Sequence, residues 1–228
     1  MLDIKTAEEA YKKIKAHVDD DPKGIKMLTI QLAAALKSQE LYDSKGIDLE
    51  IFVDTMKCFS RFCRDSFATY GDFRFDCCWW TYRQLSLNLF RLGELEFEMC
   101  ADKLSVHIPS DANMTRAGLD ASYDWAKRFF AKHFPEYEYD GIYCNTWLLA
   151  PSLREMLPAG SRILNFMDDY EILSEDKEAM NCMLWVYKKK YQDYESLPEE
   201  TSLQRAIKAR LLAGKKVGSA YGRVVRKD

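Results

Sequence analysis

Several features that would place this chain in a specialised class are missing from its 228 residues. The N-terminal residues contain no apolar stretch of the secretory kind, and the longest mostly apolar segment, Met27–Leu36, is far shorter than the roughly 20 residues of a membrane span. The net charge of −3 provides no global positive field for nucleic acid. We therefore expect a soluble protein without a nucleic-acid or membrane partner.

Metal-ligating residues are few and badly spaced. The seven cysteines are an odd number at irregular positions without a CxxC pair, and the only histidines are His17, His107 and His133. A structural zinc site needs four ligands in paired spacing. Unpaired cysteines are typical of a reducing compartment. The sequence thus predicts no metal site and a cytoplasmic location.

Helical patterns occupy the first part of the chain. A capping-box pattern at Thr6–Glu9 predicts the start of a first helix, which the acidic and Pro-Gly segment 19–24 ends. Apolar residues at helical spacing predict a second helix over 25–41 and a third over 48–70. The aromatic segment 73–89 is expected to form a further buried helix. We predict a helical N-terminal domain over residues 1–88.

The hydrophobic period changes to two after residue 88. Apolar and polar residues alternate over 92–99 and again over 103–108, which predicts two half-buried strands. The short connection at Ala101-Asp102 makes them an antiparallel hairpin. Further elements are then expected as a helix over 115–133, strands over 141–149, 162–166, 183–188 and 221–225, and a helix from 197 or 201 to 213. The fold class is therefore α/β (α+β), with a sheet domain over residues 89–228.

The predicted hairpin brings together a candidate catalytic pair. A two-residue loop sets Glu96 opposite His107 and Glu98 opposite Ser105. A carboxylate that fixes the tautomer of an imidazole makes it a usable general base near neutral pH. The alternative is an ordinary cross-strand ion pair on a solvated sheet face.

A second candidate is an anion site on the loop that leads into the helix at 115. Ser110, Asn113, Thr115 and Arg116 lie where a helix start offers free amide donors and a partial positive charge. Thr115 as a simple helix cap is the alternative. The cations from Arg205 to Lys227 form a basic end that suits a polyanion such as coenzyme A, or else a solvated surface.

Four separated segments together resemble a known family. They are LFRLGELEFE from Leu89, SVHIPS from Ser105, CNTWLLAP from Cys144 and LPEETSLQRAI from Leu197. The sequence is similar to bacterial acyltransferase-domain proteins that have a helical N-acyltransferase N-terminal domain and a GNAT-like C-terminal domain.

This resemblance implies a mixed, largely antiparallel sheet flanked by helices, and an acyl-CoA donor such as acetyl-CoA. It also implies direct attack of a small-molecule amine acceptor on the thioester, with Glu96 or His107 as the base. The Arg/Gln-x-x-Gly-x-Gly/Ala loop with which GNAT enzymes bind pyrophosphate is absent. Either the loop at 109–116 substitutes for it, or the protein no longer uses coenzyme A. Arg205 is a further candidate for cofactor binding, and the alternative function is a catalytically silent small-ligand-binding or protein-interaction module on the same scaffold.

Overall fold

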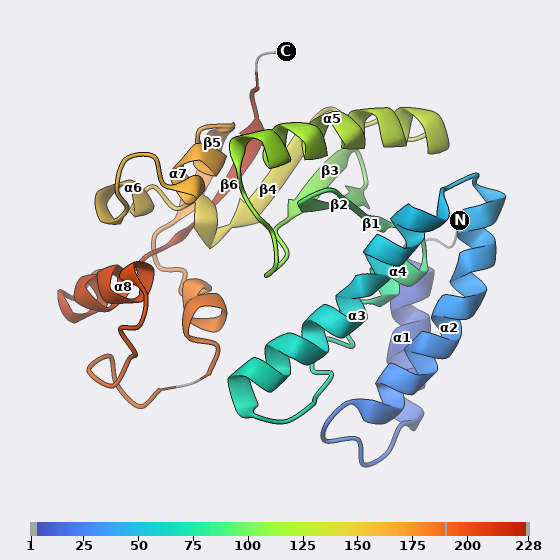
Figure 1. Cartoon of the computed structure of the whole chain (residues 1–228), viewed down its shortest axis with the longest axis horizontal. Coiled ribbons are helices and arrows are strands. Elements are labelled where there is room, and N and C mark those ends of the chain that lie inside the picture. The colour runs from blue at the N-terminus through green and yellow to red at the C-terminus, as the bar shows by residue number, and fades with distance from the viewer. Residues whose placement is uncertain (1–3, 190, 227–228) are drawn as a thin grey trace. The chain divides into compact units, whose positions relative to one another are not determined.

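A computed structural model describes residues 4–189 and 191–226 (Figure 1). The chain forms two compact units. The first comprises the residues up to Asp102 together with His107–Asn113 and Asp120–Glu138, and the second comprises Lys103–Val106, Met114–Leu119 and the residues from Tyr139 onward. Within the described part of the chain, every helix is too short or too polar to cross a membrane.

Four helices open the first unit. They are α1 (Ile4–His17), α2 (Ile25–Ser44), α3 (Leu49–Tyr70) and the short α4 (Tyr82–Leu85). The predicted second and third helices are confirmed, and Gly71 ends α3 in the left-handed conformation that glycine adopts without strain. Apolar side chains of α2, α3 and the segment before α4 form a core of Met27, Ala35, Cys58, Phe59, Phe75 and Cys78.

Two details of the helical part differ from the prediction. Thr6 lies inside α1, because the helix already includes Ile4, so Thr6 is not its N-terminal cap. The segment 73–89 is mostly turns, with only the four residues of α4 helical, and the prediction of a long helix there was wrong. Aromatic residues without helical periodicity do not specify a helix.

An antiparallel hairpin of β1 (Leu89–Leu92) and β2 (Leu95–Cys100) completes the framework of this unit, and β1 is a strand that the sequence pattern missed. Gly93, with φ +71°, makes the connecting turn. A Cβ at this position would lie 2.6 Å from the Ser122 Oγ, and that hydroxyl accepts the Glu94 N–H. Backbone conformation and space therefore both require glycine there.

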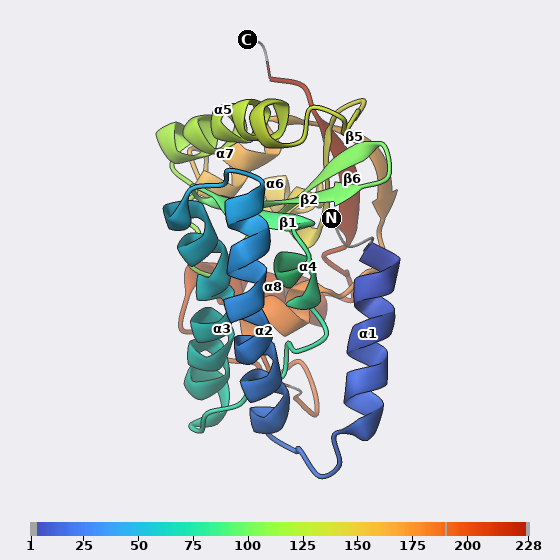
Figure 2. The ribbon, with the colours of Figure 1, turned by 90° about the vertical axis from the view of Figure 1, so that its right-hand side faces the viewer.

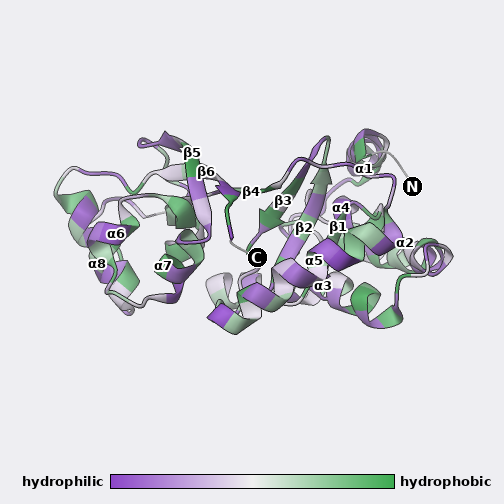
Figure 3. Ribbon diagram, turned by 90° about the horizontal axis from the view of Figure 1, so that it is seen from above, coloured by the Kyte–Doolittle hydropathy of each residue, from purple (hydrophilic) through white to green (hydrophobic). Residues whose placement is uncertain are grey.

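The two faces of the hairpin meet different helices (Figure 2). Phe90 and Phe97 pair across the strands and pack on Phe129 and Tyr123 of α5 (Arg116–His133). Figure 3 shows α5 with both hydrophilic and hydrophobic segments, as expected for a helix that covers a sheet with one side. The opposite face of the hairpin carries Glu96 and Glu98, and it meets α3 and α4 through ion pairs described below.

The second unit is built on a sheet of mixed direction. Its strands are β3 (Lys103–His107, of which the first four residues belong here), β4 (Ile142–Thr146), β6 (Ser219–Val224) and β5 (Tyr170–Asp176), in that spatial order. β3 and β4 are parallel, whereas β4–β6 and β6–β5 are antiparallel. The predicted fold class, a mixed and largely antiparallel sheet with flanking helices, is confirmed.

Short helical segments connect these strands. They are the 3₁₀ turn η1 (Trp147–Leu149), α6 (Leu153–Met156), α7 (Arg162–Met167), the π-helical turn η2 (Met183–Tyr187) and α8 (Ser202–Leu212). A capping box of Thr201 and Gln204 begins α8, which lies within the range predicted for a helix. The strands predicted over 162–166 and 183–188 were wrong: the first is α7, capped by Ser161, and the second is η2. Short apolar runs do not distinguish strand from helix by periodicity.

Candidate active site

In the first unit, His107 at the end of β3 is held by a carboxylate. Its Nε2 lies 2.8 Å from Glu98 Oε2, and the Nε of Arg83 donates to the other oxygen of Glu98 at 2.9 Å. β2 carries Glu98, and α4 carries Arg83. The carboxylate is thus fixed from both sides, and it in turn fixes the orientation of the imidazole.

Aromatic packing completes this cluster. The Trp80 ring meets the His107 ring edge-on, with centroids 4.8 Å apart, and the Arg83 guanidinium lies 4.2 Å above the Trp80 ring. The His107 side chain remains 27% exposed, against 10% for Glu98. Within the described ranges, the second nitrogen of His107, Nδ1, has no hydrogen-bond partner. This nitrogen is therefore open to accept a proton from a ligand.

Electrostatics keep Glu98 ionised. Burial alone would raise the pKa of Glu98, but the hydrogen bond with His107 and the charges of His107 and Arg83 outweigh burial and hold the pKa below its ordinary value. Burial, with the negative charge of Glu98 nearby, raises the pKa of the Cys100 thiol to about 12. The neighbouring thiol is therefore protonated and does not compete as a nucleophile at neutral pH.

The predicted pairing of Glu96 with His107 was wrong. Glu96 Oε1 accepts a hydrogen bond from Arg61 of α3 at 2.5 Å, and both side chains are buried, with 3% and 5% exposed. Burial acts to lower the pKa of Arg61, but the charge of Glu96 overcomes it and raises this pKa. Residues two apart on a strand share a face, so Glu98 lies on the same side of β2 as Glu96 and binds His107 in its place.

The residues that sequence reasoning missed are Glu98 as a functional group, Arg83 and Trp80. The signal for Glu98 was present, since it shares a face with Glu96 and belongs to the same alternating run. Arg83 and Trp80 carried no such signal, because the turns that bring them to His107 follow no hydrophobic period.

The part of the predicted anion loop that belongs to the first unit is tied to acidic residues. Ser110 donates to Asp65 at 2.6 Å, and the backbone N–H of Asn113 donates to Glu94 at 2.6 Å. Between them, Asp111 accepts from Arg91 at 2.9 Å. Protein carboxylates thus already occupy the donors that an incoming phosphate would use.

The remaining predicted anion-binding residues lie in the second unit. Thr115 caps α5 by accepting the Gly118 N–H, which is the structural alternative for this residue. Arg116 binds both oxygens of Asp169 at 2.8 Å, and Arg205 donates to the backbone carbonyl of Glu199 at 2.7 Å. Lys227 lies outside the described residues. A role of these residues toward coenzyme A stays a prediction.

The parallel pairing of β3 and β4 is brief. It consists of Leu104 with Ile142 and Ser105 with Tyr143, although β4 continues to Thr146 along β6. The backbone oxygen of Val106, the next residue of β3, accepts the thiol of Cys144 at 3.2 Å. Cys144 is buried, which raises its thiol pKa. The strands therefore separate after two residue pairs, and a weak side-chain donor replaces the backbone ladder.

Solved structures of similar fold are acyltransferases. One is an acyltransferase in complex with decanoyl-CoA and teicoplanin, with a TM-score of 0.80 and 26% identity. A second is an acyltransferase in complex with CoA and 10C-teicoplanin, with a TM-score of 0.80 and 25% identity. Each comparison covers 85% of this chain and 64% of the other chain, so this chain spans less than two thirds of their length. A search among curated proteins finds no match.

Two family descriptions match consecutive parts of the sequence. Residues 2–87 match the N-acyltransferase N-terminal domain, and residues 89–224 match the GNAT-like C-terminal domain. The second match alone covers more than half of the 228 residues. The expected resemblance is confirmed, and the chain belongs to the family of proteins with a GNAT-like C-terminal domain.

Proposed function

We propose that this protein is an acyl-CoA-dependent N-acyltransferase that transfers an acyl group to a small-molecule amine. The observation that carries the proposal is the Glu98–His107 pair, whose imidazole is oriented through Nε2 and open at Nδ1. The similar acyltransferases in complex with decanoyl-CoA and with CoA support an acyl-CoA donor. The family descriptions of both halves support the same activity.

The proposed reaction needs one base. The amine nitrogen attacks the thioester carbonyl carbon and forms a C–N bond, and His107 Nδ1 accepts the proton that this nitrogen loses. Collapse of the tetrahedral intermediate breaks the C–S bond, and the thiolate of coenzyme A leaves and takes up that proton. The products are the amide and free coenzyme A. Glu98 acts as a positioning residue, because its carboxylate accepts a hydrogen bond from the protonated Nε2 of His107 and thereby leaves the Nδ1 lone pair free.

The separated strands of the second unit support donor binding. An extended ligand chain can hydrogen-bond to backbone groups where a ladder ends. The ladder of β3 and β4 ends at Tyr143, and the Cys144 thiol donates to the Val106 carbonyl. Because a thiol is a weak donor, a ligand amide would displace it at small cost.

Three further assignments belong to this proposal. Residues 1–88 and 89–228 are the two domains, supported by family matches that meet between residues 87 and 89. Ser110, Asn113, Thr115, Arg116 and Arg205 are the candidate donor-binding residues, and the network of protein partners around them would have to rearrange for a phosphate. The location is cytoplasmic, in keeping with seven free thiols.

Calorimetry and a product assay test the proposal together. The full chain is titrated with acetyl-CoA and decanoyl-CoA, and release of free coenzyme A is followed with a thiol reagent in the presence of a panel of primary amines. We expect donor binding and amine-dependent release of coenzyme A. A folded protein that binds neither donor at millimolar concentration would contradict the proposal and favour the silent binding module.

A further inference from the structure

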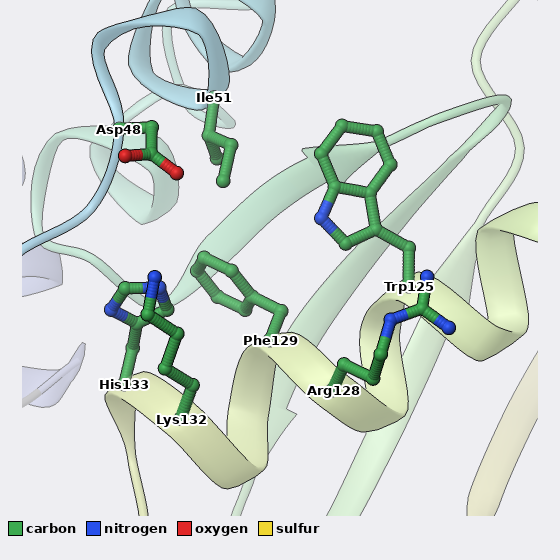
Figure 4. Close-up of a pocket in the computed structure, with 7 residues that line it drawn as sticks. All are labelled: Asp48, Ile51, Trp125, Arg128, Phe129, Lys132 and His133. Atoms are coloured by element: carbon green, nitrogen blue, oxygen red, sulfur yellow. The ribbon is translucent and has the colours of Figure 1, made fainter.

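A pocket of about 300 Å³ lies in the first unit, between the beginning of α3 and the last turns of α5 (Figure 4). Ile51 of α3 and Phe129 of α5 line it and are themselves almost fully buried. The half-buried Trp125 forms another wall, and its indole nitrogen is turned toward the opening. The pocket therefore offers an apolar and aromatic surface of the size that suits a small ligand.

Three charged side chains surround this surface without a protein partner. Across residues 4–189 and 191–226, no side chain forms a hydrogen bond or ion pair with Asp48, Arg128 or Lys132. Figure 4 shows the Asp48 carboxylate and the Lys132 ammonium on the same side of the opening, while Arg128 lies near Trp125. Both signs of charge are thus available to one molecule.

A buried histidine adds a directed polar group. His133 is only 7% exposed, and its Nδ1 lies 3.0 Å from the backbone oxygen of Lys45. A carbonyl only accepts, so Nδ1 carries the proton, and Nε2 of the neutral ring is an acceptor. In the part of the chain that the structure describes, Nε2 has no partner, and His133 lines the pocket. An acceptor in this position calls for a ligand that donates a hydrogen bond.

We propose that this pocket binds a free α-amino acid with a large apolar or aromatic side chain. Its ammonium donates to the Asp48 carboxylate and to Nε2 of His133. Its carboxylate pairs with Lys132 and Arg128. Its side chain packs on Ile51, Phe129 and Trp125. A zwitterion is the class that uses both signs of free charge, and the Nε2 acceptor of His133 favours it over a ligand that carries only a carboxylate.

The site is separate from the proposed acyl transfer and does not depend on it. None of its lining residues belongs to the His107 cluster, and the ligand is bound, with no bond made or broken. Binding is therefore measured in the absence of an acyl donor, and loss of acyl transfer would leave the result unchanged.

The test is calorimetric titration of the full chain with L-phenylalanine, 2-phenylethylamine and 3-phenylpropanoate. For a ligand of this size we expect a Kd on the order of a millimolar for phenylalanine. The two analogues, which each lack one charge, should bind about tenfold more weakly. No heat from phenylalanine well above that concentration would overturn the proposal, as would 3-phenylpropanoate binding as tightly as the amino acid.

Variants assign the charges to their residues. Asp48→Asn should weaken the binding of phenylalanine and 2-phenylethylamine about tenfold and leave the binding of 3-phenylpropanoate unchanged. Lys132→Gln should instead weaken the binding of 3-phenylpropanoate and leave that of 2-phenylethylamine unchanged. Asp43→Asn and Lys37→Gln, which remove exposed charges from α2 outside the pocket, serve as matched controls. Equal binding in all four variants would place the ligand elsewhere and refute the site.

Discussion

Two glutamates of one strand show how neighbouring carboxylates acquire different tasks. Glu96 and Glu98 lie two residues apart on the same face of β2, and each meets an arginine. Glu96 is enclosed with Arg61, whereas Glu98 shares its charge between Arg83 and the accessible His107. The enclosed pair joins α3 to the hairpin, and the open pair is the one to which we assign proton transfer.

The difference comes from the partners and not from the strand. α3 is a long regular helix that delivers Arg61 into the interior, where exposure of the pair falls to 5% or less. α4 is a single helical turn that follows a segment of irregular turns, and it places Arg83 near the surface, where the His107 side chain is 27% exposed. Removal of one partner from a buried ion pair lowers the free energy of unfolding strongly, whereas removal of one partner from a partly exposed pair lowers it little.

The largest expected effect is on stability at the enclosed pair. Glu96→Gln leaves the Arg61 guanidinium buried beside a neutral group, and we expect the free energy of unfolding to fall by about 3 kcal/mol. Urea denaturation measures this change. The double variant Arg61→Met with Glu96→Leu should recover most of the loss, because apolar side chains can replace a buried ion pair. A double variant as unstable as the single one would show that the pair itself, and not its imbalance, supports the fold.

The next effect is on turnover at the open pair. His107→Ala removes the proposed base and should lower kcat about 100-fold, with donor affinity nearly unchanged. Release of free coenzyme A and calorimetry measure the two quantities. Ser105→Ala, on the same strand, is the matched control. An equal fall in kcat in both variants would contradict the role of His107 as the base.

A smaller effect is expected when only the positioning carboxylate changes. Glu98→Gln keeps a hydrogen-bonding side chain beside His107 but removes its charge, and we expect kcat to fall about tenfold. The KM for the donor should stay nearly unchanged, because Glu98 acts through the orientation of His107. Release of free coenzyme A measures kcat and KM. A kcat equal to that of the parent protein would mean that Glu98 does not act on His107.

The smallest effect is on acid stability. The folded-state pKa of Glu98 is lowered, so this group adds stability above its ordinary pKa, and that stability is lost as pH falls below about 5 and through the lowered value. Glu98→Gln should therefore show a shallower fall in the free energy of unfolding between pH 6 and pH 3. The exposed Glu195→Gln is the control. A slope in Glu98→Gln as steep as in the parent protein would contradict the pKa direction.

Regular amphipathic segments were predictable from the sequence. The helices α2, α3, α5 and α8 begin and end within a few residues of the predicted positions, because apolar spacing and capping residues act locally. The alternation over β2 and β3 also predicted strands correctly. Within the candidate site, His107 and a glutamate partner on β2 followed from that alternation.

Elements whose form depends on tertiary contacts were not predictable. β5 has one buried residue, Tyr170, and a register irregularity after Ile172, so it shows no alternation. α7 is six residues long, too short for a helical period, and only its Ser161 cap marks it. The choice of Glu98 over Glu96 depends on where α3 places Arg61, and a strand pattern holds no information on a distant helix.

The turn at Gly93, between β1 and β2, fixes the register of the hairpin. The positive φ of Gly93 and the nearby Ser122 hydroxyl both require glycine at this position, and they define the conformation of the turn between β1 and β2. A slip of one residue would turn both carboxylates toward the phenylalanines on α5 and bring Phe97 to the arginines. A residue without a side chain thus sets the register of the hairpin, and through it keeps both carboxylates on the face that carries the imidazole.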